Sequence, residues 1–278
     1  MPIRTILLHM ANDDAHANRL AVAATLAKRF AAHVEVLYIA TPVSMPAGAT
    51  GRAASYGYIA EATAIAHENA ERIEGETALA LAGLPYRWSV EEGDHVALLA
   101  ERATYADLAI VAQSATERSG DRIALQVPDR LPLATACPTL VLPPGQPVGA
   151  PIGRHVLIAW KNSRESTHAV RNAMPFLETA ETVTVLTVEP PGHHARTTGN
   201  DGDALVEWLD RHGIAARHRN AVALGGEVGD MILSSAAELG ADLLVMGAYG
   251  HSRLRELVLG GATRSVLAHM PLPALMSH

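Results

Sequence analysis

The sequence has little of what secreted or membrane-spanning proteins require. Its 278 residues include one cysteine, Cys137, which cannot form an internal disulfide and therefore indicates a reducing compartment. No apolar run approaches the roughly 20 residues of a transmembrane helix, and the first residues lack the apolar core and cleavage site of a signal peptide. We therefore expect a cytoplasmic protein with no membrane partner.

Charge and chemical motifs are also sparse. The net charge of −7 at pH 7 argues against a general affinity for nucleic acid or anionic membranes. The chain has no Gly-Lys-Ser/Thr phosphate loop and no G-x-S-x-G nucleophile motif. His193 and His194 stand in a Gly/Pro-rich loop without a further spaced ligand, which argues against structural zinc. We expect no catalytic residue, no metal ligand and at most weak ATP hydrolysis.

What the sequence does contain is a repeated unit. Strand-like segments at residues 3–9 and 153–159 are each followed by a polar loop, an alanine-rich helical pattern and a second strand. The second strands read HVEVLYI and TVTVLTV, which share valines and a leucine in register. The triplet Ala-Asp-Leu then occurs in both copies, at residues 106–108 and 241–243, and leads into a further strand each time. A repeat of this length indicates two duplicated domains.

A run of proline and glycine separates the copies, because it can neither pair in a central strand nor continue a helix. It divides the chain into residues 1–146 and residues 147–278. Two loops rich in small residues, 41–54 and 190–202, are expected to lie outside the cores. Alternating strands and helices predict an α/β fold, with an open parallel sheet covered by helices on both faces in each domain. In such sheets a ligand binds beyond the carboxyl ends of the strands.

The most specific stretch is a strand followed by glycine turns near the carboxy terminus. The apolar run ends at Gly247, then Gly250 and the pair Gly260-Gly261 follow, and Thr263 opens another helical pattern. Glycine lets backbone N–H groups approach a ligand with no Cβ in the way, and a helix N-terminus favours an anion. A single glycine here is usually only a turn former, but the whole spacing is restrictive. It predicts a phosphate cradle.

This spacing, Gly-x2-Gly-x9-Gly, resembles the nucleotide-binding signature of universal stress proteins, in which Ser or Thr follows the third glycine. Gly247, Gly250 and Gly260 fill the glycine positions, whereas Gly261 stands where the hydroxyl is expected. The departure removes one phosphate hydrogen bond but leaves the backbone amides. The resemblance implies a stress-response protein with two tandem Rossmann-like domains of the adenine nucleotide alpha hydrolase type, and ATP or ADP as the ligand.

The resemblance also implies which residues would surround the nucleotide. These are Ala159, Trp160, Lys161, Val188, Met246, Gly247, Gly250, Gly260, Gly261, Ala262 and Thr263. The family often has Asp where this chain has Lys161, and a lysine cannot ligate Mg²⁺ but can pair with phosphate. Trp160 would border adenine, although packing explains it equally well. Arg253 and Arg255 are expected in a flap between the glycine turns.

The first domain departs from this pattern. Its strand at residues 108–112 runs into Gln113, Ser114, Ala115 and Thr116, where glycines would be needed, and Gly120 is isolated. Side chains would then occupy the space that phosphate needs. We expect this domain to bind no nucleotide and to serve as a structural or partner-binding copy.

Three functions remain open at this stage. The first is a tandem universal stress protein that binds ATP or ADP in its carboxy-terminal domain as a regulatory ligand. The second is a nucleotide-independent module that recruits an unknown protein partner, in which the closing strands of the halves join an intramolecular pseudo-dimer, with a homodimer as a further level of assembly. The third is a slow ATPase or an adenylating ligase, but the Ser-Gly-Gly-x-Asp-Ser loop of such ligases is absent after either first strand.

Overall fold

The computed structural model describes residues 2–40, 52–113, 127–147, 149–189, 199–223, 227–250 and 261–278. In the first half of the chain, strands and helices alternate along most of the sequence. The strands are β1 (Thr5–Met10), β2 (His33–Ala40), β3 (Tyr86–Glu92), β4 (Leu108–Ala112) and β5 (Thr139–Leu142). The helices are α1 (His16–Phe30), α2 (Arg52–Ala80), α3 (His95–Ala103) and α4 (Val127–Ala134).

The second half repeats this order. Its strands are β6 (His155–Ala159), β7 (Thr182–Glu189), β8 (Ala216–Val222), β9 (Leu243–Gly247) and β10 (Ala274–Ser277). Its helices are α5 (Arg164–Leu177), α6 (Gly199–Arg211), α7 (Val228–Glu238) and α8 (Gly261–His269). The halves differ most between their second and third strands, where the 29-residue α2 corresponds to the 13-residue α6.

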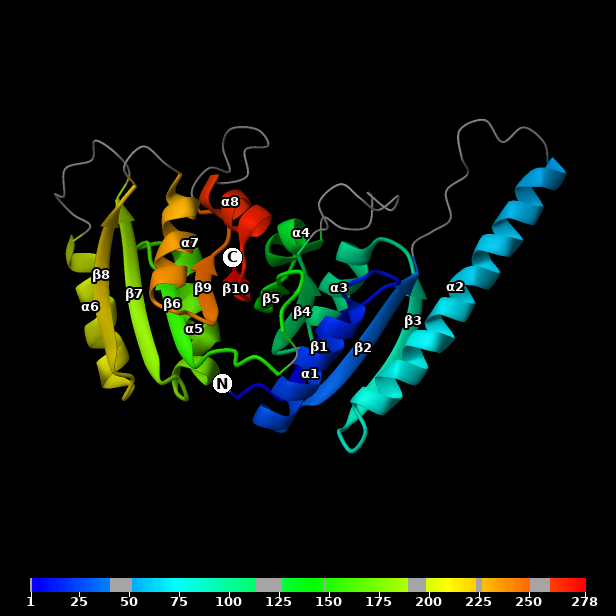
Figure 1. Ribbon diagram of the computed structural model, residues 1–278, viewed down its shortest axis with the longest axis horizontal. Coiled ribbons are helices and arrows are strands. Elements are labelled where there is room, and N and C mark those ends of the chain that lie inside the picture. The colour runs from blue at the N-terminus through cyan, green and yellow to red at the C-terminus, as the bar shows by residue number, and fades with distance from the viewer. Residues whose placement is uncertain are drawn as a thin grey trace.

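All of these strands belong to one ten-stranded sheet, in the order β3-β2-β1-β4-β5-β10-β9-β6-β7-β8. Neighbouring strands are parallel within each half, whereas β5 and β10 pair antiparallel, with Leu140 opposite Leu275. The pairing of the closing strands that the family resemblance implied is therefore confirmed. Because the hydrogen bonding continues across the junction, the two halves form a single sheet (Figure 1).

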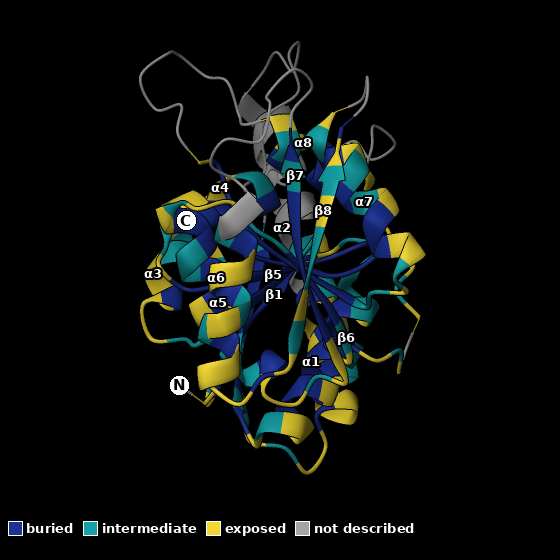
Figure 2. Ribbon diagram, turned by 90° about the vertical axis from the view of Figure 1, so that its left-hand side faces the viewer, coloured by how far each residue is buried: buried dark blue, intermediate teal, exposed yellow. Residues whose placement is uncertain are grey.

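Helices cover both faces of this sheet. Helices α1, α2, α5 and α6 pack on one face, and α3, α4, α7 and α8 pack on the other. Figure 1 shows α4 and α8 together above the junction of β5 and β10, with α1 and α5 below it. The central strands are buried on both sides (Figure 2), which explains their nearly continuous apolar sequences. No helix in the described ranges has the length and apolar character needed to span a membrane.

The repeated Ala-Asp-Leu triplet has the same structural role in each half. The Asp107 carboxylate accepts hydrogen bonds from the backbone N–H groups of Arg4 and Thr5 at 2.8 and 2.9 Å. The Asp242 carboxylate likewise accepts from three consecutive amides, beginning with Gly153 at 2.7 Å. Each aspartate therefore fixes the start of the first strand of its half against the fourth strand.

The start of α6 and the domain border differ in how far they agree with the sequence-based predictions. The prediction that residues 190–202 form a loop is wrong from Gly199 onward, because α6 begins there. Gly202 is buried in that helix, since a Cβ at this position would lie 2.2 Å from Nε2 of His218. The predicted domain border lies between the end of β5 and the start of β6, and independent folding of the two domains stays a prediction.

Candidate functional site

The carboxyl ends of three parallel strands meet in the second half of the chain. Ala159 at the end of β6 lies opposite Leu186 of β7 on one side and Met246 of β9 on the other. The chain runs outward from β6 through β7 to β8 and then crosses back to β9 on the other side of β6. The ends of β6 and β9 therefore form the switch point at which open α/β sheets bind ligands. A cavity of about 830 Å³ opens there, which is within the usual size range of ligand pockets.

The structure brings most of the predicted site residues together around this cavity. Ten of the eleven line it, namely Ala159, Trp160, Lys161, Val188, Met246, Gly247, Gly250, Gly261, Ala262 and Thr263. The remaining one, Gly260, lies outside the described residues, as do Arg253 and Arg255. Residues from four separate stretches of sequence therefore share one cavity, which is the geometric requirement for a common ligand.

Gly247 is needed for packing as well as for access to the cavity. A Cβ on this residue would lie 2.6 Å from the backbone nitrogen of Ser166 and 2.7 Å from the carbonyl carbon of Glu165. These are backbone atoms of α5, which cannot move aside cheaply. The first glycine of the signature thus allows the end of β9 to approach the start of α5.

The N-terminus of α8 opens into the cavity through Gly261, Ala262 and Thr263. A Cβ on Gly261 would meet no atom within 4 Å, so the space beside it is open. The hydroxyl of buried Thr263 accepts a hydrogen bond from the Tyr249 amide at 3.2 Å, which ties the strand end to α8. The first N–H groups of an α-helix have no partner within the helix, and together with the helix dipole they make this end of the cavity attractive to an anion.

Acidic side chains outnumber basic ones among the described residues that line the cavity. Lys161 is the base, and the acids are Glu165, Glu189, Asp201 and Glu227. Glu165 is buried in the first turn of α5, and a Cβ on Gly250 would lie 3.4 Å from its Oε2 atom. A carboxylate in this place disfavours a phosphate beside Gly250, so Lys161 and the amides of α8 must offset it.

A hydrogen-bonded relay lies behind the cavity wall at β7, where Thr187 and Glu189 line the cavity. Thr187 Oγ1 lies 2.8 Å from His218 Nε2, and His218 Nδ1 lies 2.9 Å from Asp203 Oδ1. Asn220 accepts a hydrogen bond from Thr187 and donates one to Glu189 at 3.0 Å. Sequence reasoning missed these residues, because they come from β7, β8 and α6 and no local spacing relates them.

Trp160 combines the two roles considered for it. Its indole packs against the core beneath α5 and α6, and it also lines the cavity. Its Nε1 atom is buried and has no hydrogen-bond partner among the described residues. The ring is therefore held as a wall of the cavity by apolar contacts.

The corresponding position in the first half is filled by side chains. In the repeat, His9 stands where Ala159 stands in the second half, and its Nε2 lies 2.9 Å from Nδ1 of His95. Arg19 donates to the His9 carbonyl at 2.7 Å and makes two bonds to the Asp13 carboxylate. Burial lowers the pKa of His9 well below its ordinary value, and the nearby charge of Arg19 acts in the same direction. The imidazole is therefore neutral near pH 7.

The residues that replace the glycines in the first half are only partly described. Ser114, Ala115, Thr116 and Gly120 lie outside the described residues. Gln113 follows β4 and donates a hydrogen bond from Nε2 to the carbonyl oxygen of Leu267 in α8, at 2.7 Å. In this half the strand end therefore contacts the other half of the molecule.

A mostly parallel α/β sheet with a cavity at its switch point and a helix N-terminus facing that cavity defines a Rossmann-like protein. Within this class, residues 153–278 match the model of the universal stress protein family. This half of the chain belongs to the universal stress protein family.

Individual relatives agree with this assignment. The chain is 42% identical over 52 residues to universal stress protein Slr1230 of Synechocystis sp., a match that covers 19% of this chain and 18% of that protein. A universal stress protein of Archaeoglobus fulgidus has a similar structure over 98% of this chain and 97% of its own, with a TM-score of 0.74 at 16% identity. A Pseudomonas aeruginosa UCBPP-PA14 protein described under the same family name reaches a TM-score of 0.63 at 19% identity, over 99% and 93% of the two chains. The whole chain therefore has a tandem universal stress protein fold.

Proposed function

We propose that the chain binds ATP or ADP in its carboxy-terminal half and uses the nucleotide as a regulatory ligand in a stress response. The observation that carries the proposal is the cavity shared by ten residues of the predicted nucleotide site. Adenine would pack between Val188 and Met246, and the phosphates would extend toward Gly250 and the start of α8. The family resemblance of the glycine signature supports this orientation.

The phosphates would be held mainly by backbone groups. The backbone amides at the start of α8 would supply hydrogen-bond donors, and Gly261 leaves the approach open. Lys161 is exposed at the rim and would add one positive charge. With lysine in this place and Glu165 near Gly250, the affinity would depend on a balance between these opposite charges.

Calorimetric titration of nucleotide-free protein with ATP tests the proposal. We expect one equivalent per chain, and we expect Gly261→Glu to abolish binding because its carboxylate would occupy the anion position. Gly261→Ala is the matched control, because its methyl group enters open space and should change the affinity less than about threefold. Absence of binding at millimolar ATP, or two equivalents per chain, would contradict the proposal.

Glu165 provides a second, charge-specific test. We expect Glu165→Gln to strengthen ATP binding about fivefold, close to 1 kcal/mol, because it removes a negative charge beside Gly250. Adenosine, which has no phosphate, should bind both proteins equally. Glu227→Gln on the exposed side of the cavity is the control, and its effect on ATP should be smaller. Equal gains in affinity for ATP and adenosine would show that the effect of Glu165→Gln does not depend on the phosphates.

A nucleotide-independent interaction module is the second candidate function. The hydroxyl missing at position 261 and the acidic lining of the cavity favour it. In that case the intramolecular pseudo-dimer would recruit an unknown protein partner, and the Gly261→Glu variant would keep its full biological effect. Loss of that effect together with loss of ATP binding would favour the regulatory ligand.

A further inference from the structure

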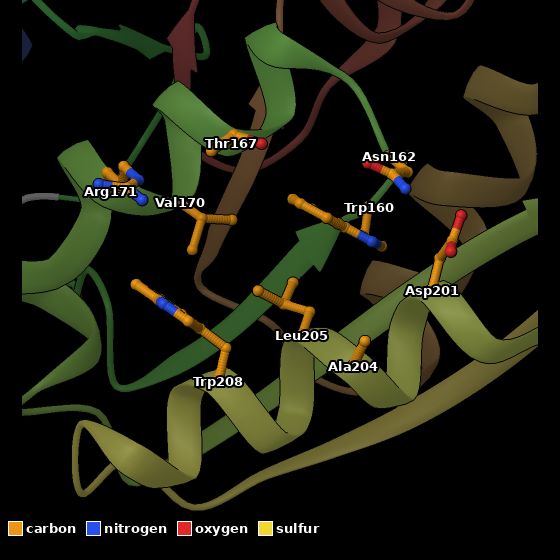
Figure 3. A pocket seen from close by; sticks show the side chains of 9 residues that line it. All are labelled: Trp160, Asn162, Thr167, Val170, Arg171, Asp201, Ala204, Leu205 and Trp208. Carbon is orange, nitrogen blue, oxygen red and sulfur yellow. The ribbon is translucent and has the colours of Figure 1, made fainter.

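A smaller cavity of about 260 Å³ lies between α5 and α6, next to the proposed nucleotide cavity (Figure 3). Trp160, Asn162 and Asp201 line both cavities, whereas Val170 and Leu205 line the smaller one and do not reach the larger. We call this smaller cavity the indole slot. The glycine signature contributes no residue to it, so it is distinct from the predicted phosphate cradle.

The indole slot has apolar walls and an open rim. In Figure 3 the rings of Trp160 and Trp208 lie on either side of Val170 and Leu205. Val170 and Leu205 are buried, whereas Ala204 at the rim is exposed. A dry apolar cavity of about 150 Å³ is enough to bind benzene. The slot can therefore accommodate one substituted aromatic ring, which can enter from the solvent side.

Charged groups stand at two places on the rim. The Asp201 carboxylate makes no hydrogen bond or ion pair with any described residue, and it lies in the first turn of α6. The Arg171 guanidinium lies over the ring of Trp208, with Cζ 5.9 Å from the ring centroid. Within the described part of the chain, Asp201 therefore has no partner that would compete with a cationic ligand, whereas Arg171 has an aromatic partner.

We propose that the indole slot binds a small arylalkylamine cation. The aromatic ring of the ligand would lie among Trp160, Val170, Leu205 and Trp208, and its ammonium group would face Asp201 and the adjacent Trp160 ring. Indole faces attract cations, and the net charge of −7 favours the approach of a cationic ligand over that of an anion. This site is independent of the proposed nucleotide site, although the two share a wall.

Titration with 2-phenylethylamine, followed by the indole N–H signals in a ¹⁵N–¹H spectrum, tests the proposal. The chain has three tryptophans, so three signals can be assigned with single Trp→Phe variants. We expect the Trp160 and Trp208 signals to shift together and reach saturation, whereas the signal of Trp88 in β3 should not move. Neutral 2-phenylethanol has the same shape and should bind about fivefold more weakly, because it lacks the charge.

Matched variants separate charge from shape. Asp201→Asn should weaken the amine about three- to fivefold and leave the alcohol unchanged, whereas Asp210→Asn, an exposed change on the same helix, should affect neither. Ala204→Leu should fill the slot and abolish both ligands, with the fold checked by circular dichroism. Gly261→Glu should keep the amine affinity of the native chain. Equal affinities for amine and alcohol, or an amine affinity unchanged by Asp201→Asn, would overturn the proposal.

Discussion

The three described glycines in and beside the carboxy-terminal signature have different surroundings. Gly247 contacts the backbone of α5, Gly250 faces the Glu165 carboxylate, and Gly261 borders open space. In the sequence they differ only in their spacing, which cannot separate a glycine needed for packing from one that leaves room for a ligand. Side-chain volume at each position therefore tests a different property, and only Gly261 offers a clean test of ligand binding.

The single cysteine should be chemically inert in the folded protein. Cys137 is buried, and burial raises the pKa of its thiol to about 12, with a smaller contribution from the charge of Asp107. Since the thiolate is the reactive form, we expect no labelling by a disulfide reagent at pH 8 and one equivalent after unfolding in urea. Rapid stoichiometric labelling of the native protein would contradict this environment for Cys137.

The buried histidine pair should make stability depend on pH. Burial is the largest cause that lowers the pKa of both His9 and His95 below the ordinary value of 6.5. As the pH falls below about 6.5, the unfolded chain binds protons that the folded chain does not. The stabilisation is therefore present above that pH and is lost on acidification, by about 1 kcal/mol per pH unit for His9 alone.

Urea unfolding between pH 7 and pH 5 measures this effect. We expect a smaller pH slope of the free energy of unfolding in His9→Asn than in the native chain. His33→Asn, which changes a partly exposed histidine, should keep the native slope. Identical slopes in all three proteins would assign the pH dependence to other groups.

At the scale of elements, the contact between β9 and α5 should be intolerant of a methyl group. We expect Gly247→Ala to lower the free energy of unfolding by about 2–3 kcal/mol, because its Cβ would lie 2.6 Å from the Ser166 nitrogen. Gly261→Ala adds the same methyl group in open space and should change stability by less than about 0.5 kcal/mol. Urea denaturation of the two variants gives the comparison, and equal stabilities would mean that β9 can shift away from α5.

Sequence patterns predicted the buried elements better than the edge ones. Strands β1, β2, β6, β7 and β9 are apolar and were recognised, whereas the edge strand β8 reads ARHRNAV and gives no apolar run. Its side chains are partly buried or exposed at every position, and they include two arginines that a central strand would exclude. Helix α6 was not predicted, and its first residues were assigned to a loop, because Gly199 and Gly202 are typical of loops and the burial of Gly202 depends on the distant His218.

The candidate site could be located from sequence but not described in full. The resemblance carried by the glycine signature implied eleven site residues, and ten of them line the cavity. The acidic residues Glu165 and Asp201 and the Thr187–His218–Asp203 relay were not predicted. They come from separate elements that only the folded sheet brings together, so a linear spacing rule contains no information about them.

At the scale of the whole molecule, each half covers an edge strand of the other half's sheet. Strand β5 pairs with β4 on one side and with β10 on the other, so separation of the halves would expose unpaired backbone groups. We expect residues 147–278 produced alone to self-associate through β10, as measured by light scattering over a concentration series, with the intact chain as control. A fragment that remains monomeric at high concentration would show that this edge is protected in another way.

The junction of β5 and β10 also sets how the assembly responds to protein abundance. Two separate subunits dissociate when they become scarce, whereas partners on one polypeptide keep a constant local concentration of each other. In this chain the partner strand is covalently attached, and the register places Ala274 opposite Val141 whatever the number of copies in the cell. Changes in expression would thus alter how many joined pairs exist, but not the fraction that is joined.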